Sequence, residues 1–579
     1  MKKVNVCILA SCVLALTACG GMQKMADMAN QVRYEVTPKV LEMHGDSVEI
    51  EISVTFPPKY FVAEASLELV PVLKYEGGEK AFDSKTVQGE KVQANNEVCS
   101  FANGGTFKLK SKIAFEEAMR SSELYARATA SMKGKSVNVP EQKIADGVMA
   151  TALLLDNNAK TIAAADKFQR ISTNEKGATL FFVINKADIT NKELNKEEVA
   201  TLKKFLKDAA ADERTEIKGI TISAYASPDG EESLNDKLAA NRMNNSNKFF
   251  QQELKKAKIK ADESVFNKTS LAEDWDGFKT LMQQSDIQDK ELILRVLSMY
   301  SDPVVREKEI KNISAAYEEI AEKILPQLRR SKLTVNIAVI GHSDEEIKDL
   351  VASNPDTLSV EELLYAATLT NDNAEKLSIY QKAANKYPED WRTINNVGHI
   401  NFLMGNVDEA KAAFEKAKGI DASNTTVLNN LGACAYAEGD AVAAKEYFDA
   451  AAGAGNEVSY NQAVIATKKG DYETALNLFS SSRFDSFNWA LAKLLNYSNT
   501  KNQDVFDASL GILNKIEDQN DPKIAYLKAV ISARKQDKDG IINNLKVAVE
   551  KDAALGAYAA KDIEFAQYAD DADFQSVAK

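Results

Sequence analysis

Histidine and cysteine are scarce in this sequence. Its 579 residues include three histidines and five cysteines, and His44, His342 and His399 fall in three separate regions. The chain also lacks H-E-x-x-H, G-x-S-x-G, a G-x-x-x-x-G-K-[ST] phosphate loop and, after residue 19, C-x-x-C, which are motifs of common catalytic and metal sites. We therefore expect no catalytic residues, no metal and no cofactor.

Long apolar runs and an excess of positive charge are missing too. The run from Val4 to Leu16 is too short to cross a membrane, and 45% hydrophobic with 27% charged residues is typical of globular domains. The net charge is −13, and it becomes −15 when residues 1–18 and their two lysines are removed. This balance disfavours nucleic acid as a partner.

The first residues have the pattern of an export signal. Lys2 and Lys3 precede the apolar run, and Leu16-Thr17-Ala18-Cys19 resembles the lipobox of bacterial lipoproteins. The resemblance implies a signal peptide at 1–18, lipidation of Cys19 by acyl chains such as palmitate, and a tether at 19–31. The alternative is an ordinary secretory signal with an incidental cysteine. Without an aspartate or acidic cluster after Cys19, the resemblance implies an outer-membrane anchor and a body in the periplasm.

Residues 32–155 have the composition of strands. Segments such as 48–56, 65–73 and 106–115 alternate apolar with polar residues between Gly, Pro and Asn clusters. They predict an antiparallel β-sandwich and carry no recognisable chemistry. Two cysteines lie beyond residue 19, Cys99 and Cys434, and we expect both to be buried apolar residues rather than a disulfide.

Residues 167–345 mix strands and helices. Strand patterns at 178–185, 220–225 and 332–340 alternate with two amphipathic helices, which predicts a β-α-β-α-β layer. The stretch at about 263–328 has helical spacing and predicts an insertion. Its aromatic and leucine residues are expected to form a core rather than a cofactor pocket; they are Trp275, Phe278 and Leu281.

Residues 359–579 are helical and repetitive. Gly405 and Phe414 recur at one common step as Gly439 and Phe448, and a third copy follows after a slightly shorter step, with its glycine at Gly470. An opening aromatic, a packing glycine and an alanine–aromatic pair resemble the tetratricopeptide (TPR) pattern. The resemblance implies an all-α solenoid of helix pairs with a concave face that suits a protein segment.

The central region resembles a second family. Gly230, Asn235, Leu238 and Arg242 have the spacing of the OmpA-like, peptidoglycan-associated domain, and the pair Arg329-Arg330 resembles its closing motif. The resemblance implies that Arg242 binds the diaminopimelate carboxylate of peptidoglycan. A guanidinium can donate two parallel hydrogen bonds to such a group.

The residues that accompany Arg242 depart from that family. Its usual aspartate position holds Ser227, and Asp229 follows two residues later. Either Asp229 substitutes from a shifted turn, or the site has lost its selectivity for a zwitterion. The alternative for Arg242 is a solvated arginine or one that donates to turn carbonyls, and for Asn235 it is a residue that ties down the loop.

Together these patterns predict a non-catalytic adaptor, lipid-anchored in the outer membrane and facing the periplasm. It would bind peptidoglycan through the OmpA-like domain, at the candidate residues above, and a protein partner in the TPR groove. Two alternatives stay open: an accessory subunit of a secretion, assembly or uptake machine that binds no peptidoglycan, and an envelope hydrolase. Packing roles are expected for His399 and Cys434 in the repeats.

Overall fold

The computed structural model describes residues 20–579, with the backbone alone described at 314–316 and 499. The predicted signal peptide, 1–18, and Cys19 lie outside the described residues, so both stay predictions. Between residues 20 and 579, no helix is long and apolar enough to cross a membrane.

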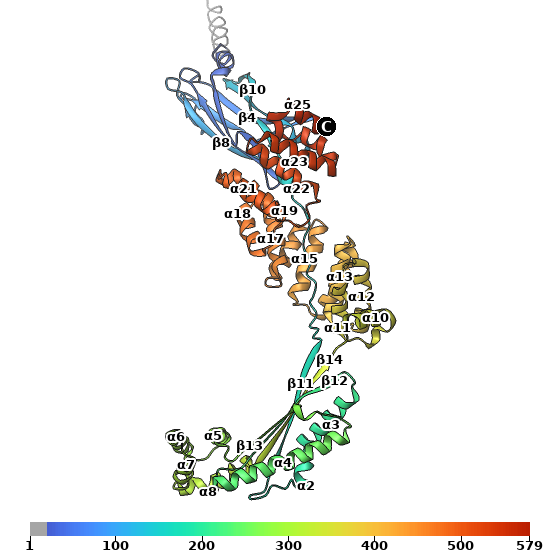
Figure 1. Ribbon diagram of the computed structural model, residues 1–579. Helices are drawn as coiled ribbons and strands as arrows, with labels where there is room; N and C mark the ends of the chain where they lie inside the picture. Colours follow the sequence, from blue (N-terminus) through green and yellow to red (C-terminus); the bar gives the residue numbers. More distant parts are fainter. Residues whose placement is uncertain (1–19) are drawn as a thin grey trace, which may run out of the picture. The chain divides into compact units, whose positions relative to one another are not determined.

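The chain forms two compact units, which are described one at a time. The first unit joins the chain up to Ala165 with Asp372–Lys579, and the second unit is Asp166–Asn371 (Figure 1). The second unit thus extends past the expected boundary at 345. It includes two further helices, α10 (Asp344–Ser353) and α11 (Val360–Ala366).

The start of the first unit is β-rich. Ten strands of its described residues pair along a continuous path, β1-β3-β2-β10-β9-β4-β6-β7, with β5 on β4 and β8 on β3. The expected antiparallel pairing is wrong at β2–β10 and β6–β7, which are parallel. Short β2 pairs antiparallel with the start of β3 on one side and parallel with the end of β10 on the other. The strands are β1 (Arg33–Thr37), β2 (Val40–His44), β3 (Ser47–Phe56), β4 (Ser66–Tyr75), β5 (Gly78–Ala81), β6 (Lys85–Gly89), β7 (Glu97–Cys99), β8 (Gly105–Ala114), β9 (Ser122–Met132) and β10 (Lys135–Met149).

The predicted tether is folded from residue 20 onward. Residues 20–27 are helical, and a 3-10 turn follows at Ala29–Gln31. Met22 and Met25 are fully buried in the core of the β-rich region. The chain is therefore held against that region almost from the residue after Cys19.

The helical part of the first unit consists of antiparallel helix pairs. Gly398 shows why the repeat needs glycine, since an added Cβ would lie 2.6 Å from Cε1 of the buried Phe414. Gly432 and Phe448 repeat this contact at 2.7 Å. The helices are α12 (Asn373–Lys386), α13 (Trp391–Leu403), α14 (Val407–Ile420), α15 (Thr425–Ala437), α16 (Ala441–Ala450), α17 (Asn456–Lys468), α18 (Tyr472–Ser482), α19 (Phe487–Leu495), α20 (Tyr497–Thr500), α21 (Asp504–Leu513), α22 (Pro522–Arg534), α23 (Lys538–Lys551), α24 (Ala554–Ala560) and α25 (Ala572–Val577).

The β-rich region and the helix pairs pack together within the first unit. The guanidinium of Arg120 lies 3.7 Å from the ring centroid of Tyr558, and the His44 ring meets Tyr472 edge-on at 5.0 Å. Cys99 and Cys434 are both free and buried, which confirms the expectation for them. The two regions are thus parts of one folded body.

The second unit is built on a four-stranded sheet of order β11-β14-β12-β13. The expected β-α-β-α-β succession is present, with helices α3 and α4 packed on the sheet. One strand, β13, lies within the predicted helical insertion. Its residues are mostly exposed, so its sequence lacks the alternation of apolar and polar residues by which a strand is recognised. The elements are β11 (Ile171–Phe181), α2 (Asn191–Leu194), α3 (Glu197–Ala211), β12 (Thr215–Tyr225), α4 (Glu232–Lys256), β13 (Phe266–Leu271) and β14 (Arg330–Ile340).

The rest of the insertion is helical and has its own core. Phe278 is 1% exposed, and Trp275 and Leu281 pack against the same cluster, which confirms their expected core role. The helices are α5 (Trp275–Gln284), α6 (Lys290–Met299), α7 (Pro303–Lys311), α8 (Ser314–Lys323) and α9 (Leu325–Leu328).

Candidate functional site

The predicted carboxylate-binding residues meet where β12 ends and α4 begins. Ser227 and Asp229 lie in the connecting turn, while Asn235 and Arg242 lie on α4. Ser227, Asn235 and Arg242 are 5%, 7% and 1% exposed. The structure thus brings these residues together, and three of the four are buried.

Arg242 donates to backbone carbonyls. Its Nε lies 3.0 Å from the Lys186 oxygen, its Nη1 2.9 Å from the Tyr225 oxygen and its Nη2 3.4 Å from the Val183 oxygen. Burial, together with the nearby positive charge of Arg329, lowers the pKa of Arg242 to about 10. The guanidinium therefore ties the end of β12 to the segment after β11, which is the role of an arginine that donates to turn carbonyls.

Asp229 has a different arginine as its partner. Its carboxylate receives a 3.0 Å hydrogen bond from Arg329 Nη2 and another from the Ser227 hydroxyl, while Arg329 Nε donates to Ser227 Oγ at 3.2 Å. Asn235 donates to the carbonyls of Ser227 and Gly230 and so ties down the loop. The resemblance to the OmpA-like family points to the pair Arg329-Arg330 without revealing this contact.

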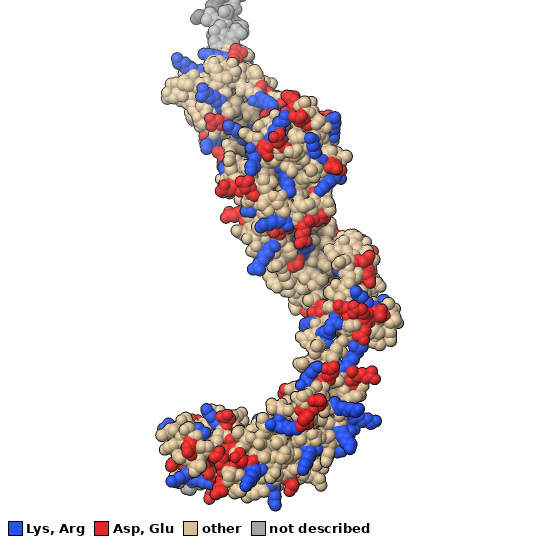
Figure 2. Space-filling view, viewed as in Figure 1, with Lys and Arg blue, Asp and Glu red and all other residues tan. Residues whose placement is uncertain are grey.

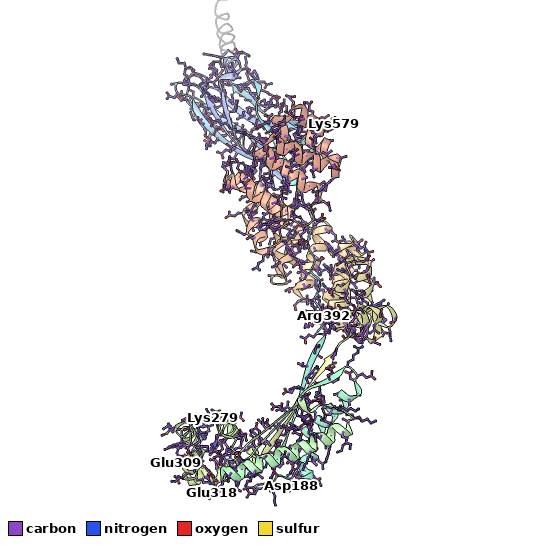
Figure 3. All side chains as sticks on the ribbon, viewed as in Figure 1. Asp188, Lys279, Glu309, Glu318, Arg392 and Lys579 are labelled. Carbon is purple, nitrogen blue, oxygen red and sulfur yellow. The ribbon has the colours of Figure 1, made fainter. Side chains whose placement is uncertain are left out.

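A second candidate site lies in the first unit, where residues 156–164 run through the repeat groove. We call this segment the strap. Four asparagines on successive first helices of the repeats hold it, beginning on α13, whose Arg392 is labelled in Figure 3. Each asparagine accepts a hydrogen bond from one strap N–H and donates one to the C=O of the same residue, at 2.7–2.9 Å. The pairs are Asn396 with Ala164, Asn430 with Ile162, Asn461 with Lys160, and Asn488 with Asp156.

Two further asparagines complete this ladder. Asn395 donates to the Ile162 carbonyl and Asn429 to the Lys160 carbonyl, each at 3.1 Å. The amides also bond one another, as in the 2.9 Å contact from Asn430 Nδ2 to Asn395 Oδ1. All six asparagines are at most 1% exposed. In the structure, the groove that the sequence predicts for a protein partner holds the strap, a segment of the chain itself.

The sequence contains a signal for the ladder, which the predicted site residues did not include. Asn395-Asn396 recurs as Asn429-Asn430 at the step that separates Gly405 from Gly439, and Asn461 follows Asn430 at the shorter step that separates Gly439 from Gly470. These are the steps of the repeat itself. A polar residue that recurs at a buried position of each repeat indicates a shared hydrogen-bonding partner.

Two residues expected to pack in the repeats have different surroundings. Cys434 is fully buried and burial raises its pKa to about 12, so it is an unreactive packing residue. His399 instead contacts the strap, with Nδ1 2.8 Å from Thr161 Oγ1. Burial of the ring, with a smaller contribution from Lys376, lowers the pKa of His399 to about 4.

The pKa of His399 predicts a pH-dependent stability of the first unit. The unfolded chain binds the proton at about pH 6.5 and the folded chain only near pH 4, so the stabilisation is complete above pH 6.5 and is lost as the pH falls toward 4. The full loss is about 3 kcal/mol. Urea unfolding at pH 7 and pH 4.5 should show a smaller loss for His399→Gln than for the unchanged protein. His342→Gln, in the second unit, should leave the loss unchanged, and equal losses in all three proteins would contradict this role.

Comparisons with known proteins identify the repeats. A family model described as tetratricopeptide repeat matches residues 392–424. Among solved structures, the chain is similar to a TPR protein of Parabacteroides merdae (14% identity, 36% of this chain, 85% of that chain, TM-score 0.28), Pseudomonas aeruginosa pilF (15%, 40%, 97%, 0.28) and yeast Tom70 (16%, 65%, 84%, 0.26). No curated protein matches the chain.

The C-terminal helical region thus contains tetratricopeptide repeats. Repeats of this kind are generally non-catalytic scaffolds for protein–protein interaction. In the part of the chain that the structure describes, no group of three or more His, Cys, Asp or Glu side chains is placed to hold a metal ion. Acidic and basic side chains are interspersed over the face seen in Figure 2.

Proposed function

We propose that this protein is a non-catalytic adaptor of the bacterial envelope, anchored by lipid in the outer membrane with both units in the periplasm. The observation that carries the proposal is the tetratricopeptide array, because scaffolding is what such arrays do. Packing of the array with the β-rich region supports it further, since a single folded body can present surfaces from both regions to a partner.

The lipid anchor rests on the lipobox-like residues that end at Cys19. Several acyl chains, each burying about 0.8 kcal/mol per methylene, hold a protein stably on a membrane. Since the chain is already folded onto the β-rich region at Met22, lipidation of Cys19 would keep that region close to the membrane surface. Changing Cys19 to serine should then move the protein from the membrane fraction to the soluble fraction.

Of the two adaptor versions, we favour an accessory subunit that does not bind peptidoglycan through Arg242. The second unit has the strand and helix succession that the patterns of residues 167–345 predict. However, Arg242 is buried and donates to three carbonyls, and Asp229 is paired with Arg329. Neither side chain is available to a zwitterion without breaking these contacts.

Affinity purification from solubilised outer membranes tests the adaptor function. We expect stoichiometric protein partners, and we expect them to remain when residues 166–371 are replaced by a short flexible linker. This deletion keeps the strap, the β-rich region and the repeats, whereas removal of 359–579 would destroy the first unit. Loss of the partners in the deletion variant would assign recruitment to the second unit. Absence of partners from both proteins would overturn the adaptor proposal.

A further inference from the structure

We propose that the repeat groove is a clamp for an extended polypeptide, and that the chain keeps this clamp closed with its own strap, residues 156–164. The inference deepens the adaptor function proposed above, because it names a partner chemistry and a control over partner access. Only the biological role of the clamp depends on the proposed adaptor function. The clamp itself is a property of the first unit alone.

The clamp recognises backbone rather than side chains. Each of the four paired asparagines uses its amide oxygen for a strap N–H and its amide nitrogen for the C=O of the same residue. Every residue except proline offers this donor and acceptor together. Any extended segment without proline at the four paired positions could therefore replace the strap along the ladder.

Side chains of the strap add a modest selectivity. Ala159 and Thr161 are buried at 9% and 7% exposure, so the clamp accepts small residues at these two positions. Between them, Lys160 Nζ lies 4.9 Å from the ring centroid of Tyr460 and 5.1 Å from that of Phe484, which favours a cation. The partner that fits best is thus an extended segment with a small residue, a lysine or arginine, and another small residue in succession.

The covalent link makes the strap a strong competitor. A segment attached through a short linker acts at an effective concentration in the millimolar range. A free segment must displace the strap, which occupies the clamp at this effective concentration. The apparent affinity of the free segment is therefore lower than its affinity for the empty clamp. Partner binding in the groove therefore requires release of the strap.

Proline substitutions in the strap provide the test, because they leave every groove residue unchanged. Ile162→Pro with Ala164→Pro removes two N–H groups that the ladder holds. Ala163→Pro with Ala165→Pro is the matched control, since it places two prolines at the exposed alternate positions. The probe is a fluorescent synthetic peptide with the sequence of residues 154–166, and its binding to each purified full chain is followed by anisotropy.

We expect the released variant to bind the peptide at least about 10-fold more tightly than the unchanged protein and the control variant. Adding Asn430→Ala and Asn461→Ala to the released variant should abolish binding. Equal affinities for the unchanged and released proteins would overturn the proposal. So would a released variant that keeps its circular dichroism and melting transition but binds no peptide.

Hydrogen exchange on the unchanged protein gives a second test that does not depend on a variant folding. The amides of Lys160, Ile162 and Ala164 should exchange slowly, and millimolar unlabelled peptide should speed their exchange several-fold by occupying the groove when the strap opens. Unchanged exchange would overturn the proposal. Both experiments use the purified chain, so their failure leaves the membrane purification as an independent test of the adaptor function.

Discussion

Replacing Arg242 with alanine should lower the free energy of unfolding of the second unit by about 3 kcal/mol. The guanidinium is 1% exposed, and the substitution leaves the carbonyls of Val183, Lys186 and Tyr225 without their donor. Arg242→Lys should lose most of the same energy, because one ammonium cannot reach three carbonyls in the planar arrangement of a guanidinium. Pulse proteolysis across a urea series, with fragments assigned to the second unit by mass, measures the loss.

The exposed Lys237 provides a control on the same helix, and Lys237→Ala should change stability by less than about 0.5 kcal/mol. The same variants separate a structural role from a ligand role. In the absence of urea, where Arg242→Ala is still folded, sedimentation with purified sacculi should match that of the unchanged protein. A loss of sedimentation by a folded Arg242→Ala, without a loss of stability, would restore Arg242 as a peptidoglycan ligand.

Arg242 also illustrates what sequence reasoning can resolve. The spacing of Gly230, Asn235 and Arg242 correctly predicts a strand, a turn and a helix whose polar residues converge. Helical and strand periodicities are local, so they are visible in the sequence. Whether a guanidinium faces a ligand or three carbonyls depends on the path of the segment around Val183–Lys186, which is remote in sequence. The pairing of Asp229 with Arg329, 100 residues away, is hidden for the same reason.

The strap was hidden for a different reason. Its contacts with the ladder use backbone atoms, which every residue possesses, so residues 156–164 show no pattern and look like a linker between domains. The asparagines do show a pattern, since they recur at the same steps as the repeat glycines. Buried asparagines need partners, and six of them on one face imply a polar chain beside that face. The asparagine pattern indicates that a polar chain lies beside the helices. It does not identify this chain as residues 156–164, because the strap lies 232–332 residues away from the asparagines in sequence.

Replacing Arg534 with methionine should lower the free energy of unfolding of the first unit by about 3–5 kcal/mol. Arg534 donates from Nε to both oxygens of Glu564, at 3.0 and 3.2 Å, and from Nη2 as well, and their side chains are 10% and 1% exposed. Glu564 also accepts a hydrogen bond from Thr151, which follows β10, so the pair lies where the β-rich region meets the repeats. Removing Arg534 leaves a buried carboxylate without its counter-charge, and urea unfolding should show the loss.

The double variant distinguishes a lost ion pair from a lost side chain. If the loss of stability comes from the unpaired carboxylate of Glu564, adding Glu564→Leu to Arg534→Met should recover at least about 2 kcal/mol of the free energy of unfolding. The reason is that an apolar pair of similar volume often replaces a buried ion pair without loss of stability. Additive losses would mean that the two side chains stabilise the unit independently, by packing. Because Thr151 needs Glu564 as its acceptor, the double variant should also speed hydrogen exchange at the end of β10, while the strap amides stay protected. Equal loosening of both segments would show that this contact and the strap open as one cooperative unit.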